Sequence, residues 1–182
     1  MAIDISNRAE LENMALDGWG DYLVVAPIDL SDAPWETPFP DYNTRFYGSF
    51  DGGFHEISGL HGDPLIGYSR DGDGTIKNVI LTGANVTGGG CLCGLHGSNQ
   101  PGEITDCYVS GHLQANIAGS GGLVGNPYNK IRRCTFEGTV TTSNDRRVGL
   151  LVGYGRNLIE DCSATGTLIY STSTTNTTVG AF

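Results

Sequence analysis

The chain has 182 residues, of which 28 are glycine, and its 20 acidic and 10 basic residues leave a net charge of −10. A length of this order forms one domain with its own core. The acidic balance argues against a phosphate-binding surface and against nucleic acid as a partner. No apolar run approaches the roughly 20 residues that cross a bilayer, so membrane insertion is not expected.

The first forty residues carry the helical signal of the chain. Asn7 and Glu10 form an N-x-x-E pattern that begins a helix, and Leu11 and Met14 belong to a short apolar stripe. A strand is expected over residues 22–30. The opening segment is acidic where a signal peptide needs a basic and then an apolar region, so we expect synthesis in the cytosol without a Sec-type leader.

The rest of the sequence repeats. TIKNVILTGANV (75–86), EITDCYVSGHL (103–113), KIRRCTFEGTV (130–140) and LIEDCSATGTL (158–168) align. Their lead isoleucines, Ile76, Ile104, Ile131 and Ile159, are spaced 28, 27 and 28 residues apart. PLIG (64–67), CLCG (91–94), GLVG (122–125) and LLVG (150–153) lie between these segments. Such a period, with short strand-like runs between Gly, Asn, Asp and Ser, is typical of the coils of a β-solenoid.

We therefore predict an all-β fold, a parallel β-solenoid of about 27–28 residues per coil. A short N-terminal helix would cap its first open edge, which otherwise presents unpaired backbone groups. Residues 1–44 are assigned to this cap and the first strand and loop, and residues 45–182 to the solenoid repeats.

Three cysteines occupy equivalent positions in successive repeats: Cys107, Cys134 and Cys162. Their side chains should stack about 4.8 Å apart, the spacing of neighbouring strands. A metal rod or a disulfide is conceivable at this spacing, but parallel side-chain directions suit a disulfide poorly. Because free cysteine is a good core filler, we expect an inert buried ladder.

A charged column precedes the cysteines. The slot two residues after each lead isoleucine holds Asn78, Asp106, Arg133 and Asp161. Arg133 should therefore lie between two carboxylates from adjacent coils, with Arg132 beside Glu160. Stacked acids that are paired in this way favour a structural role over a catalytic dyad.

Signals for catalysis or metal binding are weak. Asp71-Gly-Asp73-Gly74 is similar to the start of a calcium loop, but the later oxygen ligands of such a loop are missing, so a turn explains it. The four histidines, His55, His61, His96 and His112, are scattered, and no nucleophile motif is present. We expect no catalytic residues, no metal and no cofactor.

Two tyrosines are the best candidates for ligand binding. Tyr128 and Tyr154 follow the GLVG-type motif by one to three residues in successive coils. Tyrosine combines an apolar ring with a polar tip and suits stacking against sugars. The alternative is that these rings only cover the strand ends.

These motifs resemble the GLUG-repeat family of β-helical modules over nearly the whole chain. RFYGSFDGGFHEISGL (45–60) is similar to the family segment F-x-G-x-F-D-G-x-G-H-x-I-x-x-L, with Phe54 in place of the usual glycine. GLVG (122–125) matches the motif that gives the family its name. The resemblance implies a β-helix whose motif residues are scaffold, used as a display or binding element in bacterial surface proteins, adhesins, immunoglobulin A-cleaving peptidases and viral particles.

The expected function is that of a non-enzymatic structural or attachment module. The first interpretation is a virion protein made in the host cytoplasm, a phage head-decoration, fibre or tail-spike-like element that contacts a host surface or a glycan. A fragment of a bacterial cell-surface adhesin is the alternative, and a carbohydrate-active β-helix enzyme is the third.

An open edge predicts the partners. The coil over residues 158–182 would present unpaired backbone groups, because Val179 to Phe182 restarts an apolar strand without a cap. We expect this edge to bind further copies of the chain, with a trimer favoured, or other virion or surface proteins.

Overall fold

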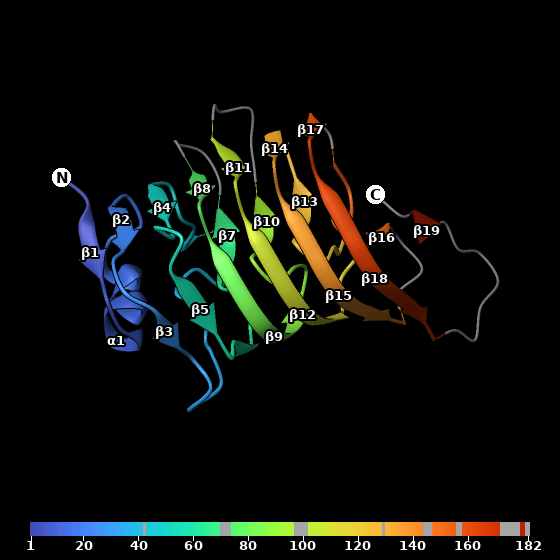
Figure 1. The fold of residues 1–182 in the computed structure, drawn as a ribbon, viewed down its shortest axis with the longest axis horizontal. Coiled ribbons are helices and arrows are strands. Elements are labelled where there is room, and N and C mark those ends of the chain that lie inside the picture. The colour runs from blue at the N-terminus through green and yellow to red at the C-terminus, as the bar shows by residue number, and fades with distance from the viewer. Residues whose placement is uncertain are drawn as a thin grey trace.

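The computed structural model describes residues 1–41, 43–69, 74–96, 102–128, 130–143, 147–155, 158–171 and 179–180. They form a β-solenoid of about five turns. In Figure 1 its parallel coils are stacked from the N-terminal end at the left to the C-terminal end at the right. In every pairing between neighbouring strands the two strands are parallel. The predicted all-β solenoid is confirmed.

Three parallel sheets form the main faces of the coils. Sheet A contains β1 (Ile3–Ile5), β2 (Asp21–Val24), β4 (Ser49–Asp51), β8 (Thr75–Lys77), β11 (Glu103–Thr105), β14 (Lys130–Arg132) and β17 (Ile159–Glu160). Sheet B contains β3 (Ile28–Asp29), β5 (Glu56–Ser58), β6 (His61–Gly62), β9 (Ile80–Gly88), β12 (Tyr108–Ala115), β15 (Thr135–Thr142) and β18 (Ser163–Tyr170). Sheet C contains β7 (Ile66–Ser69), β10 (Cys93–His96) and β13 (Val124–Pro127).

A short pair extends the last part of the solenoid. Strand β16 (Val148–Gly149) pairs in parallel with β19 (Val179–Gly180). Among the described residues, β17 and β18 are the last strands of sheets A and B.

The lead isoleucines stack in register inside the coil. Ile104 pairs with Ile76 on one side and with Ile131 on the other, and Ile131 pairs with Ile159. Ile76, Ile104 and Ile131 are 0% exposed, whereas Ile159 in the last coil is 37% exposed. The same slot is thus fully buried only where a further coil covers it.

Glycine is required where sheet B curves. Gly111, Gly138 and Gly166 lie in register on β12, β15 and β18. A Cβ on Gly138 would lie 1.8 Å from the carbonyl oxygen of Gly111, and one on Gly166 would lie 1.7 Å from that of Gly138. The close approach of successive coils excludes a side chain at these three positions, whereas Ala84, which pairs with Gly111 beside a register shift, has one.

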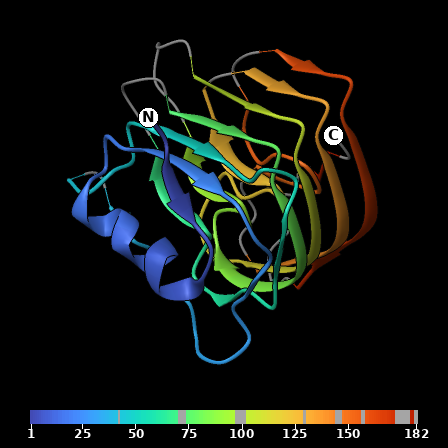
Figure 2. The same ribbon diagram turned by 60° about the vertical axis from the view of Figure 1, so that its left-hand side comes forward.

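The predicted helix caps the first coils. Helix α1 (Arg8–Glu12) is followed by the 3-10 turn η1 (Asn13–Leu16), and Asn7 accepts a hydrogen bond from the backbone N–H of Glu10. Leu11 and Met14 are each 1% exposed. Figure 2 shows the helix lying across the N-terminal end of the coils. No helix in the described parts of the chain has the length and apolarity to cross a membrane.

The strand expected over residues 22–30 is two strands, β2 and β3, separated by Val25–Pro27. Pro27 has no backbone N–H to donate to a neighbouring strand, and the chain turns here from sheet A to sheet B. Strands β1 and β2 continue sheet A, and β3 continues sheet B, so the first 44 residues contribute to the stack as well as to its cap.

Candidate functional site

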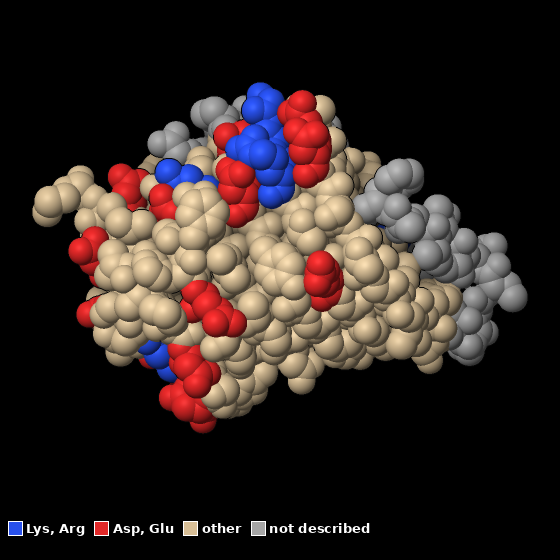
Figure 3. Space-filling view, in the orientation of Figure 1, with Lys and Arg blue, Asp and Glu red and all other residues tan. Residues whose placement is uncertain are grey.

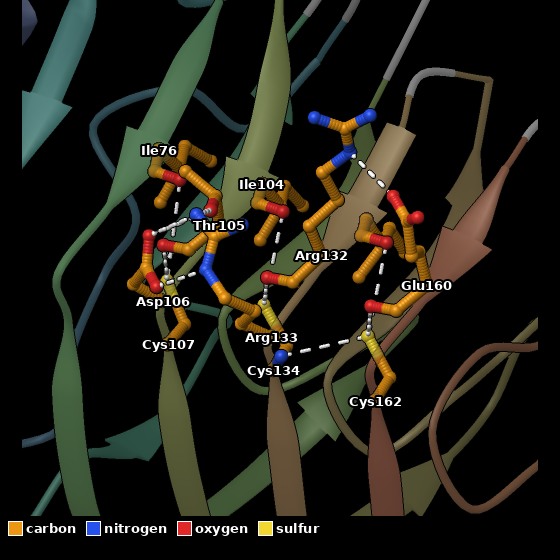
Figure 4. Close-up of polar contacts among 11 residues, drawn as sticks. Ile76, Ile104, Thr105, Asp106, Cys107, Arg132, Arg133, Cys134, Glu160 and Cys162 are labelled. Carbon is orange, nitrogen blue, oxygen red and sulfur yellow. Dashed lines mark hydrogen bonds and ion pairs between the residues drawn. The ribbon is translucent and has the colours of Figure 1, made fainter.

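A left-handed corner follows sheet A in four successive coils (Figure 4). Asn78, Asp106, Arg133 and Asp161 all have φ between 49° and 56°. Asn and Asp tolerate this conformation because their short side chains can bond locally, whereas a long side chain is strained there. Arg133 therefore occupies an unfavourable backbone position that its side-chain contacts offset.

The guanidinium of Arg133 makes a two-pronged contact with Asp106. Its Nε lies 2.6 Å from Oδ1 and its Nη2 lies 2.7 Å from Oδ2. The Thr105 hydroxyl donates to Oδ2 at 2.7 Å and accepts from Arg133 Nη2 at 2.8 Å. Hydrogen bonds from Arg133 and Thr105 lower the pKa of Asp106 to about 2. Asp106 is therefore ionised at neutral pH and does not serve as a general acid.

The charge ladder is confirmed in part. Arg132 Nε lies 3.0 Å from Glu160 Oε2, as predicted. Arg133 lies in register between Asp106 and Asp161, as predicted. Among the described residues its close ion pair is with Asp106, because the guanidinium nitrogens face that carboxylate (Figure 4). The hydrogen bonds to Asp106 raise the pKa of Arg133, and the charge of Asp161 adds to this at longer range.

The three stacked cysteines are free thiols directed inward from the corner. Sγ of Cys107, Cys134 and Cys162 each donates to the carbonyl oxygen two residues earlier, at 3.1–3.2 Å. Burial raises the pKa of Cys107 and of Cys162, whereas the hydrogen bond with Cys107 lowers the pKa of Cys134. Cys107 and Cys134 are buried and Cys162 is half-buried, which fits a packing role, and the inert ladder stays a prediction.

The described residues contain no group of three His, Cys, Asp or Glu side chains that could hold a metal ion. Asp71 and Asp73 lie outside the described residues, as does the side chain of His96. His112 lies between Asn85 and Thr141 of the adjacent coils, at 3.2 and 3.0 Å, and so cross-links sheet B.

The two predicted tyrosines do not occupy equivalent positions. Val124 bridges Val152, so the register places Tyr154 beside Asn126, while Tyr128 lies two residues further along its coil. Both rings are half-buried. The Arg147 guanidinium lies 4.1 Å from the centroid of the Tyr154 ring and covers one of its faces. A role for either ring in ligand binding remains a prediction.

An aromatic stack at the N-terminal end was not found from the sequence. The Trp19 and Tyr47 rings are 4.1 Å apart at an interplanar angle of 3°, and Trp19 is 68% exposed. Arg45 lies 5.2 Å from the Tyr47 centroid, and its Nε donates to the Tyr47 hydroxyl at 2.6 Å. Trp19 and Tyr47 are one repeat apart in the sequence, like the register pair Tyr22 and Phe50. The repeat period could therefore have predicted that the two rings are neighbours.

A groove of about 340 Å³ lies beside sheet C. Its walls come from the segments around Thr37 and Pro64 on one side and from residues 116–118 on the other. Tyr68 and Asn126 also line it. Loops outside the repeat pattern form part of this groove, so the alignment of the repeats could not predict it.

The comparisons with known proteins agree with the fold. The family model of the GLUG motif matches residues 144–169. This segment holds β16, the LLVG sequence, β17 and most of β18, so the chain is a β-solenoid that carries a GLUG motif, consistent with a GLUG-repeat β-helical module. The resemblance drawn from the sequence is confirmed.

A solved structure extends the comparison to the whole chain. A protein of Bacteroides ovatus described as a "putative immunoglobulin A1 protease" aligns with a TM-score of 0.60 and 16% identity, over 99% of this chain and 83% of that one. At this identity the similarity concerns the fold alone. A search of curated proteins finds no match.

Proposed function

We propose that this chain is a non-enzymatic attachment module whose outer surface contacts a glycan. The observation that carries the proposal is the exposed Trp19 ring held flat against Tyr47. A large aromatic ring that is already fixed loses little conformational entropy on binding and can stack on the apolar face of a sugar.

The division of labour between interior and surface supports this function. The isoleucine and cysteine columns pack into the core. Arg132 and Arg133 at the charged corner form ion pairs with Glu160 and Asp106. In Figure 3 charged side chains gather at the upper edge and over the N-terminal coils on the left, whereas the face over β12, β15 and β18 is largely uncharged. Strands β12, β15 and β18 carry a single charged residue, Glu137, among many hydroxyls. Such a surface suits display and recognition.

The proposed location is a virion, as a phage head-decoration, fibre or tail-spike-like protein that meets the host surface. A bacterial cell-surface adhesin is a second candidate, favoured by the GLUG motif and by the bacterial source of the similar structure. Mass spectrometry of purified particles and of cell-envelope fractions distinguishes the two: the chain is expected in particles, and detection only in the envelope favours the adhesin.

Binding of the labelled, purified chain to a glycan array and to intact cells tests the attachment function. Trp19→Ala should weaken glycan binding about five- to tenfold, since stacking contacts of about 1–1.4 kcal/mol are lost. Trp19→Phe should retain part of it. Leu16→Ala is the control, because Leu16 is 84% exposed in the same segment. A chain that binds neither glycans nor cells overturns the proposal, and so does Trp19→Ala binding as the unchanged protein does.

A further inference from the structure

Trp19 lies in a tight turn with the sequence Asp-Gly-Trp-Gly-Asp over residues 17–21. The Asp17 carbonyl oxygen accepts the N–H of Gly20 at 3.2 Å, and Asp17 Oδ1 accepts the N–H of Trp19 at 3.0 Å. Backbone and side chain of Asp17 therefore both close the turn. The Tyr22 hydroxyl also donates to the Asp17 carbonyl oxygen, at 2.6 Å. The exposed indole is thus attached to a fixed backbone.

The glycines on either side of Trp19 fit the turn to its neighbours. A Cβ on Gly20 would lie 2.7 Å from the Tyr22 ring, so glycine leaves room for that buried ring. The Gly18 carbonyl oxygen accepts the N–H of Tyr47 at 2.8 Å, which ties the turn to the next coil. Trp19 is therefore held against Tyr47 without a ligand, and little conformational entropy is lost when one binds.

Trp19 is the outer ring of the stack. Its side chain is 68% exposed, whereas Tyr47 is half-buried. Tyr47 covers one face of the indole at 4.1 Å, so the opposite face is the one open to a ligand. An indole face can stack on the apolar face of a sugar, and among aromatic rings it is also the best partner for a cation.

Carboxylates flank Trp19 on both sides along the chain. Asp17 and Asp21 are exposed and lie two residues before and after it, so their Cα atoms are within about 7 Å of the Trp19 Cα. Asp21 Oδ1 accepts the Ser49 hydroxyl at 2.6 Å. Within the part of the chain that the structure describes, neither carboxylate forms an ion pair. Both charges therefore act on whatever meets the ring.

The basic group beside the stack contacts the inner ring. Arg45 Nε donates to the Tyr47 hydroxyl at 2.6 Å, and its guanidinium carbon lies 5.2 Å from the Tyr47 centroid. Arg45 is half-buried and supports Tyr47 from that side. The open face of Trp19 is thus flanked by negative charge, on a chain whose net charge is −10, and this field attracts cations and repels anions.

We propose that the open face of Trp19 binds an amino sugar whose amine is free and protonated. The sugar ring stacks on the indole, and Asp17 and Asp21 attract the ammonium group. The assignment of a sugar rests on the proposed function, while the positive charge rests on the two carboxylates beside the ring. An N-acetylated sugar keeps the ring but lacks the charge, and is therefore the weaker ligand.

Calorimetric and fluorescence titration with matched oligosaccharides tests this selectivity. The probes are tetramers of glucosamine and of galactosamine, the N-acetylated form of each, and tetragalacturonate as the acidic counterpart. At least one amino tetramer should bind about fivefold more tightly than its N-acetylated form, the ratio expected for one charge pair about 4 Å apart in water. Tetragalacturonate should bind most weakly. Absence of binding by both amino tetramers, or no preference for the free amine, overturns the proposal.

Fluorescence also locates the contact. The chain has two tryptophans, and Trp35 is 1% exposed, so a change on binding at the surface reports Trp19. The change should disappear in Trp19→Phe. If it persists there, the sugar binds elsewhere and the proposal is wrong.

Isosteric variants separate charge from folding. Asp17→Asn and Asp21→Asn keep an oxygen that can accept from the Trp19 N–H and from the Ser49 hydroxyl. Each should reduce affinity for the amino tetramer about two- to fivefold and leave affinity for the N-acetylated form unchanged. Glu137→Gln removes one exposed charge from sheet B and is the matched control, which should keep the full preference. A preference that survives in the double variant overturns the proposal.

Salt provides a test that needs no variant. Raising the salt concentration from about 0.01 M to about 1 M shortens the Debye length from about 30 Å to about 3 Å. The preference of the unchanged protein for the amino tetramer should then largely disappear. A preference that does not respond to salt contradicts the role of the carboxylates.

The two proposals fail in different ways. A chain that binds glycans or cells through Trp19 without preferring free amines keeps the attachment function and loses the charge-selective site. A chain that binds amino tetramers at Trp19 but neither cells nor arrayed glycans keeps the site and rejects attachment.

Discussion

The two ends of the solenoid present the same kind of coil in different surroundings. At the N-terminal end, α1 and η1 cover the first coils, and Leu11 and Met14 are almost completely buried. At the other end, Ile159 of the last described coil is 37% exposed and Leu168 is only partly buried, although their register partners Ile131 and Val140 are 0% exposed. A slot in the repeat therefore does not determine burial by itself. Burial depends on the layer above, as expected for a structure stabilised mainly between nearest neighbours.

The largest expected effect on stability comes from an aspartate at the lead-isoleucine position, tested separately in an inner coil and in the last described coil. Ile131→Asp buries an unpaired carboxylate at a site with 0% exposure and should cost more than about 4 kcal/mol, enough to prevent folding. Ile159→Asp, at 37% exposure, should cost about 1 kcal/mol. Circular dichroism and urea unfolding measure both. Equal losses would contradict the difference between inner and terminal coils.

A truncation in the cap tests the covered end. Leu11→Ala removes a buried side chain of α1 and should lower the free energy of unfolding by about 3 kcal/mol. Leu168→Ala, at the partly exposed inward position of the last described coil, should lower it by about 1 kcal/mol. If urea unfolding finds the exposed position to be the costlier of the two, the terminal coil is covered in solution and the comparison fails.

The helix cap itself gives a smaller effect. Asn7 Oδ1 accepts from Glu10 N at 3.0 Å, and Glu10 Oε2 accepts from the N–H of Ser6, the residue before the N-cap, at 2.7 Å, so side chains satisfy two backbone donors at the helix start. Asn7→Ala should cost about 1 kcal/mol, whereas Asn7→Asp should cost little. Thermal unfolding of the two variants checks this, and no difference between them would show that the cap does not stabilise the first coils.

The smallest expected effect is the pH dependence of the charged corner. The folded-state pKa of Asp106 is lowered to about 2, so its contribution is complete above the ordinary aspartate pKa near 4 and is lost as the pH falls towards 2. The stability difference between the unchanged protein and Asp106→Asn should therefore shrink over this range. Other carboxylates titrate there too, so the difference between the two proteins is the quantity to measure. A difference that stays constant from pH 5 to 2 would contradict the ion pair.

The repeating part of the fold could be predicted because equivalent positions in successive coils have the same environment and therefore hold similar residues. The register of Ile76, Ile104, Ile131 and Ile159, and the capping helix that begins beside Asn7, follow from such patterns. The sequence placed Arg133 between Asp106 and Asp161, but which of the two carboxylates forms the close ion pair could not be predicted, because the rotamer and the backbone conformation decide it.

The surface features were less accessible to sequence analysis. Trp19 and Tyr47 are separated by the same step as the repeats, but Trp19 lies in the segment that was assigned to the cap, and Tyr47 lies before the four aligned segments. The groove beside sheet C is lined by Thr37 and by residues 116–118, and Thr37 and Phe39 pack against Gly67. Segments outside the four aligned repeats are thus where this chain departs from its scaffold.

Hydrogen exchange measured along the coils tests the central claim, that a coil with neighbours on both sides is protected more than the last described coil, which has a described neighbour on one side. The account predicts the slowest exchange in β9 and β12, which have strands on both sides, and clearly faster exchange in β18, which pairs with β15 alone among the described strands. Protection of β18 equal to that of β12 in a chain that remains monomeric at high concentration would contradict it.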